Sequence, residues 1–183
     1  MMVGARGRPL PWLRSAAALL FVSLLSACVP ATSDLLFRQD TRLRFATPQP
    51  RHEVKLPVRL TWEIKDFRVV EPASEPPRRD AGYFAVFVDR VPIRPGQTLE
   101  AVAKDDQACL KSPTCPDRTY LEQRQVYTTT ATSLTLAQVY PFAHTHDRLQ
   151  LHTATVVLMD ASGHRIGESA WEIQFRLRQK VFR

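Results

Sequence analysis

The sequence predicts an all-β protein, a two-sheet sandwich of about seven strands. Residues 58–65 alternate between apolar and polar side chains, the period of a strand with one buried face. Residues 83–88 are almost continuously apolar, which is typical of a central strand covered on both faces. Residues 149–159 and 166–177 flank a turn sequence at 160–163 and predict a long hairpin. Short strands separated by turns, with no internal repeat, favour a sandwich.

The remaining elements follow from turn and strand signals. Residues 42–45 predict a first edge strand, which Pro48 and Pro50 end. Residues 67–82 hold three prolines and read as an exposed loop. Arg94-Pro95-Gly96-Gln97 has the chemistry of a type II turn.

The pattern weakens between Thr98 and Gln125. We expect one short helix near 117–124, where Thr119 and Glu122 fit a capping box. Strand-like sequence then resumes in two segments, 126–132 and 134–136.

The amino terminus has the three parts of a secretory signal. Arg6, Arg8 and Arg14 make it basic, and the apolar run at 15–27 ends in small residues. This run is shorter than the about 20 residues that a membrane-spanning helix needs. The tetrapeptide Leu25-Ser26-Ala27-Cys28 at its end resembles the lipobox of bacterial lipoproteins.

That resemblance implies that Cys28 carries a lipid and becomes the new amino terminus. We therefore expect a signal peptide at 1–27, a lipidated tether at 28–41 and a β-sandwich at 42–183 with an insertion at about 98–125. The alternative is an ordinary signal peptide with a chance cysteine. The expected location is the extracytoplasmic face of the cell membrane. Val29 leaves an outer-membrane destination open if the host has two membranes.

Composition limits the function classes. Hydrophobic residues at 44% and charged residues at 23% are ordinary globular values and argue against wholesale disorder. The net charge is +7, but three arginines lie in residues 1–27, which leaves 22 basic against 18 acidic residues. We expect no nucleic-acid partner, because this excess is small.

Two cysteines remain beside Cys28, namely Cys109 and Cys115. An even pair in an exported chain predicts a structural disulfide. Their spacing fits neither the CxxC redox motif nor a zinc knuckle.

Four short segments carry a second resemblance: Leu60-Thr61-Trp62, Gly82-Tyr83-Phe84-Ala85-Val86, Thr132-Ser133-Leu134-Thr135-Leu136 and Val156–Gly163. They look like strands and the final hairpin of fibronectin type III and related immunoglobulin-like domains. The match covers roughly residues 55–179 and implies an immunoglobulin-like sandwich. It departs from the family in the long insertion and in lacking a tyrosine between Pro141 and Leu149. Such a likeness implies architecture, not activity.

Candidate chemistry is sparse. His144 and His146 share one face of an extended chain, with Asp147 and His152 beyond, and could meet one copper or zinc ion. A polar loop is the simpler interpretation, so we predict no metal and no cofactor.

Serine chemistry has even less support. Ser162 and Ser169 lie near His164 and Asp160 in sequence, but around a hairpin turn. No GxSxG motif is present. We predict no catalytic residues and no enzyme activity.

The tryptophans and one pair of arginines are the remaining candidates for binding. The strand spacing of Trp62 and Trp171 favours core packing over an aromatic platform for sugars. Arg78 and Arg79 could touch an acidic envelope polymer or lipid headgroups.

The sequence therefore favours a lipid-anchored binding or structural module of the bacterial cell envelope. Loops 67–82 and 98–125 would face an envelope protein or polymer, since binding residues concentrate on loops. The alternative is an extracytoplasmic metal-binding protein or enzyme that uses His144 and His146.

Overall fold

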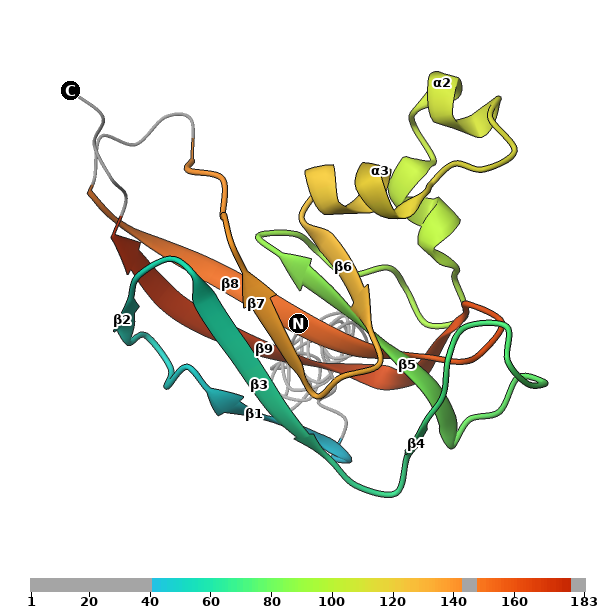
Figure 1. Cartoon of the computed structure of the whole chain (residues 1–183), viewed down its shortest axis with the longest axis horizontal. Helices are drawn as coiled ribbons and strands as arrows, with labels where there is room; N and C mark the ends of the chain where they lie inside the picture. The colour runs from blue at the N-terminus through green and yellow to red at the C-terminus, as the bar shows by residue number, and fades with distance from the viewer. Residues whose placement is uncertain (1–40, 143–147, 179–183) are drawn as a thin grey trace, which may run out of the picture. The chain divides into compact units, whose positions relative to one another are not determined.

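The computed structural model describes residues 41–142 and 148–178, all within one compact unit (Figure 1). Its strands are β1 (Leu43–Thr47), β2 (Glu53–Val54), β3 (Val58–Ile64), β4 (Arg68–Val69), β5 (Ala81–Val88), β6 (Val126–Thr129), β7 (Ser133–Leu136), β8 (Leu149–Met159) and β9 (Arg165–Arg178). Its helices are the 3₁₀ helix η2 (Leu99–Ala103), α2 (Gln107–Leu110) and α3 (Arg118–Gln123).

The strands form two sheets, as predicted. One has the order β1-β3-β7, and the other has the order β2-β9-β8-β5, with β4 and β6 sharing the far edge of β5. The order matches the immunoglobulin fold: β1, β3 and β7 take the places of strands A, B and E, and β9, β8, β5 and β6 those of G, F, C and C′. Seven strands have four or more residues, while β2 and β4 are two-residue additions.

The main core lies between the two sheets. Val58, Leu60 and Trp62 alternate along β3 and are buried, which confirms the expected half-buried strand. Trp62 packs edge-on against Phe84 of β5, with ring centroids 5.4 Å apart, and so joins the two sheets. Trp62 is a core residue, as its spacing predicted.

β5 is buried on both faces, as its continuous apolar run predicted. Phe84 and Val86 enter the main core, whereas Tyr83, Ala85 and Phe87 enter a second cluster. Residues of the insertion complete that second cluster: Leu99, Ala101, Val102 and Leu121. The insertion therefore covers the outer face of the larger sheet, above β5 in Figure 1.

The expected capping box in the insertion is wrong. α3 begins at Arg118, and its N-cap is Asp117, whose carboxylate accepts a hydrogen bond from Tyr120 N at 2.7 Å. Glu122 instead pairs with Arg118 one turn away at 2.7 Å. An aspartate directly before the first helical residue accepts from a free N–H group of the first turn, so Thr119 is not the cap.

Several boundaries differ from those expected. The loop at 67–82 contains β4, which pairs with Ala81 and Gly82, so β5 begins two residues early. β6 ends at Thr129 rather than at 132, because Thr129 Oγ1 accepts a hydrogen bond from Ala131 N at 3.0 Å and turns the chain. The type II turn at 94–97 is confirmed by a φ of 78° at Gly96 and by the Gln97 N to Arg94 O bond of 3.1 Å.

Candidate functional site

Cys109 and Cys115 form the predicted disulfide in the insertion. Asp106 supports it by capping α2 and by accepting hydrogen bonds from Tyr120 Oη at 3.1 Å and Arg124 at 2.9 Å. The backbone N–H of Cys109, and next the hydroxyl of Tyr120, hold the pKa of Asp106 below its usual range. This network links α2 to α3, so the disulfide lies in an ordered part of the fold.

The structure describes only one histidine of the predicted cluster, His152. His144, His146 and Asp147 lie outside the described residues, and so does any metal site they would form. His152 lies on the inner face of β8 and is fully buried. In the described part of the chain, no three His, Cys, Asp or Glu side chains are grouped so that they could hold a metal ion.

His152 belongs to the core. Its Nδ1 lies 2.7 Å from an oxygen of the buried Asp89 carboxylate, and its ring stacks on Phe142 and Phe175. The other carboxylate oxygen of Asp89 accepts a hydrogen bond from Thr153 N at 2.8 Å. The pair thus fastens the chain after β5 to the middle of β8.

The serine candidates meet in the wrong order for catalysis. Ser162 Oγ donates to Asp160 Oδ1 at 2.7 Å and lies 2.9 Å from His164 Nδ1. In a catalytic triad the histidine stands between serine and aspartate and accepts the serine proton. Here the serine stands between the other two and donates its hydrogen bond to Asp160, which closes the β8–β9 turn. Ser169 belongs to β9, beyond this turn.

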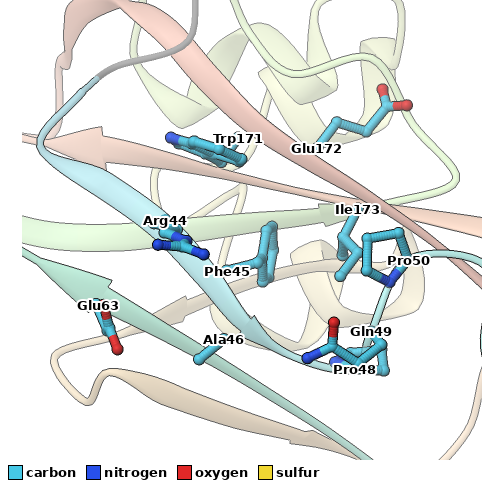
Figure 2. A pocket seen from close by; sticks show the side chains of 10 residues that line it. All are labelled: Arg44, Phe45, Ala46, Pro48, Gln49, Pro50, Glu63, Trp171, Glu172 and Ile173. Atoms are coloured by element: carbon cyan, nitrogen blue, oxygen red, sulfur yellow. The ribbon is translucent and has the colours of Figure 1, made fainter.

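A candidate binding site is a cavity of about 480 Å³ along the open side of the sandwich, which we call the seam cleft (Figure 2). Its volume is within the range of ligand pockets. Figure 2 shows the Phe45 ring between Trp171 and the turn that holds Pro48, with Ile173 beside Pro50. The full lining is Arg44, Phe45, Ala46, Pro48, Gln49, Pro50, Glu63, Trp171, Glu172 and Ile173.

The β1 side of the seam cleft is a sheet edge. Among the described strands, β1 pairs with β3 alone. The carbonyl of Arg42 accepts a hydrogen bond from Lys65 N at 2.8 Å, which sets the alternation along β1. The backbone N–H and C=O groups of Leu43 and Phe45 therefore point away from β3, toward the open side.

The other side of the seam cleft is the edge of β9. β2 pairs with β9 only at Arg176 and Leu177, and Arg51 N donates to Gln174 O at 2.6 Å. The segment 171–173 lies beyond this pairing and borders the cleft. Two strand edges thus flank one aromatic and proline-lined groove, a geometry suited to an extended peptide.

Sequence reasoning missed this site. Trp171 packs against the core, as expected, but it is only partly buried and also lines the cleft. Pro48 and Pro50 were interpreted only as the end of a strand. The signal that could have found the cleft is the pair of prolines after an edge strand, but its partner strand lies more than 120 residues away.

Comparison with known proteins adds no relative: no family model, no curated protein and no solved structure matches this chain. No helix in the described ranges has the length and apolar character needed to cross a membrane.

Proposed function

We propose that this protein is a lipid-anchored binding module on the extracytoplasmic side of the bacterial cell envelope, and that its seam cleft captures an extended segment of a protein partner. The observation that carries the binding role is the cleft of about 480 Å³ between the edges of β1 and β9. A peptide lying there would gain backbone hydrogen bonds from a strand edge and apolar contacts from Phe45 and Trp171.

The polar rim of the cleft would set the register of such a peptide. Arg44 and Glu63 are opposite each other on β1 and β3, and Glu172 stands on β9 across the cleft. Charges at a rim contribute to specificity and association rate more than to affinity. The partner segment would therefore be apolar or aromatic at its centre and charged at its ends.

The anchored location has separate support. Cys28 follows a basic segment and an apolar run in the register of a lipobox. The Cys109–Cys115 pairing is compatible with an oxidising compartment outside the cytoplasm. Two or three acyl chains at Cys28 would hold the protein at a membrane far more firmly than one chain, since each buried CH₂ contributes about 0.8 kcal/mol.

The anchor is tested by metabolic labelling with a palmitate analogue and by membrane fractionation. The native chain incorporates label and sediments with membranes, whereas Cys28→Ser does neither. The double variant Cys109→Ser, Cys115→Ser is the control, because it removes the two cysteines that the proposal does not lipidate and leaves no unpaired thiol. Unchanged labelling and sedimentation of Cys28→Ser would overturn the anchor.

The binding role is tested in cells by placing a photo-crosslinking amino acid at Gln49, an exposed residue of the cleft. Arg59, exposed on the outer face of β3, is the control position. We expect a discrete crosslinked partner from Gln49 and none from Arg59. No product at Gln49, or the same products at both positions, would contradict the role of the cleft.

A further inference from the structure

A cavity of about 290 Å³ lies between the insertion and the turn that joins β8 to β9. Four of its lining residues carry hydroxyl groups, namely Tyr83, Thr98, Thr114 and Ser162, so we call it the hydroxyl pocket. It shares no lining residue with the seam cleft. Its volume is at the lower limit of ligand pockets, which suits a small ligand or a single ring.

Tyr83 places a buried hydroxyl group at this pocket. The residue belongs to β5 and is only 5% exposed. A Cβ added at Gly163, which also lines the pocket, would lie 3.7 Å from the Tyr83 hydroxyl oxygen. Within the part of the chain that the structure describes, this hydroxyl makes no hydrogen bond. A ligand that brings an acceptor into the pocket would therefore satisfy a buried donor.

The Tyr83 hydroxyl acts as a donor over a wide range of pH. Burial, and next the negative charge of Asp160, raise the pKa of Tyr83 above its usual value. The side chain is therefore protonated at neutral pH, and the group that meets it has to be an acceptor.

The other walls of the hydroxyl pocket are held in place by the fold. Thr98, the residue before η2, forms a bridge with His164 after the β8–β9 turn. Cys115 is fixed by its disulfide to Cys109. Asp160 closes the turn by accepting hydrogen bonds from two backbone N–H groups at 2.9 Å. A ligand would therefore meet a preorganised site and would lose little free energy in ordering it.

The charge of the lining argues against an anionic ligand. Glu100 is the one carboxylate among the described lining residues, which include no lysine, arginine or histidine. Its negative charge repels anions and accepts hydrogen bonds from hydroxyl groups. The hydroxyls of Thr98, Thr114 and Ser162 can each donate and accept. A neutral ligand with several hydroxyl groups matches this mixture of donors and acceptors.

Two prolines add apolar surface to the same pocket. Pro113 and Pro116 flank the segment that holds Thr114 and Cys115. A sugar ring has polar hydroxyl groups at its edge and apolar C–H groups on its face, so it can contact both kinds of surface. We propose that the hydroxyl pocket binds a neutral sugar residue of a glycan, with Tyr83 donating to a sugar oxygen. This proposal requires neither the seam cleft nor a lipid on Cys28.

The test is saturation-transfer difference NMR on the mature protein in a zwitterionic detergent that carries no sugar. The probes are the methyl glycosides of glucose, galactose, mannose and N-acetylglucosamine, together with the four free sugars. A methyl glycoside imitates a residue linked within a glycan, because its anomeric oxygen is substituted. We expect saturation transfer to at least one methyl glycoside.

Tyr83→Phe is the main test variant, because it removes the hydroxyl without breaking a described hydrogen bond of the fold. It should weaken the Kd for the glycoside about five-fold, the effect of one lost neutral hydrogen bond, and leave the urea midpoint unchanged. Tyr127→Phe is the matched control: it removes the hydroxyl of a half-buried tyrosine outside the pocket and should bind as the native protein does. Thr114→Val changes an exposed loop residue of the pocket, so it should weaken binding without risk to the core.

Each result supports or overturns the proposal. Absence of saturation transfer to every sugar overturns it, and so does binding that is unchanged in both Tyr83→Phe and Thr114→Val. Binding of free sugars without methyl glycosides overturns the glycan as the source of the ligand. Saturation transfer to Nα-acetyl-lysine amide, lost in Tyr83→Phe, with no transfer to sugars, overturns the sugar in favour of a basic peptide side chain. None of these results bears on the anchor or on the seam cleft.

Discussion

Gly82 in β5 has no room for even a methyl group. Its φ is +154°, and a Cβ added there would lie 1.8 Å from the carbonyl oxygen of Met159, where ordinary contact begins near 3.4 Å. The β8 backbone would have to retreat by the difference, about 1.6 Å, beside the Tyr83–Met159 pair. Backbone strain of about 1–3 kcal/mol and overpacking of a similar size predict that Gly82→Ala lowers the free energy of unfolding by about 4 kcal/mol.

The matched control is Gly96→Ala. Gly96 also has a positive φ, +78°, but a Cβ there meets nothing within 4 Å. Only the backbone cost remains, about 1 kcal/mol. Urea unfolding followed by tryptophan fluorescence measures the free energy of unfolding of both variants. In a thermal melt, Gly82→Ala should lower the melting temperature of a domain of this size by roughly 10 °C. Equal losses in the two variants would refute the packing argument.

Three further predictions concern stability. Asp89→Ala removes the acceptor for His152 Nδ1 and Thr153 N and should lower the free energy of unfolding in urea by about 3 kcal/mol; a loss below about 1 kcal/mol would contradict the buried pair. Replacing both Cys109 and Cys115 by serine should cost about 2 kcal/mol, and reducing agent should destabilise the native protein but not this variant. The pKa of Asp106 is lowered in the folded state, so its contribution is present above the ordinary Asp pKa of about 3.9 and is lost as pH falls through the folded pKa. Asp106→Asn should therefore flatten the acid limb of the stability–pH curve, and an unchanged limb would contradict the assignment.

The strands could be predicted from the sequence wherever one face or both faces are buried by neighbouring strands. The alternation of β3 and the continuous apolar run of β5 each reflect that burial directly. The strands β2 and β4 have two residues each and are too short to show an alternation of apolar and polar side chains. The helices η2 and α2 are also too short for an apolar period, and Asp117 took the capping role because it lies directly before the helix.

The seam cleft could not be predicted, because it exists only after β1 and β9 meet. Trp171 has the spacing of a core residue, and nothing local indicates that β2 pairs with β9 only beyond it. The cavity lined by Arg42, Arg78, Arg79 and Arg165 is an intermediate case. Arg78 and Arg79 are adjacent in sequence, but Arg42 and Arg165 join them only through the strand order.

The state of Cys28 tests the central claim most directly. Intact-mass and amino-terminal peptide mass spectrometry of the protein purified from membranes would measure it. A lipid-anchored module predicts a mature chain that begins at Cys28 and carries a diacylglyceryl group. A chain that begins at Met1, or that is cleaved elsewhere with an unmodified Cys28, would contradict the account.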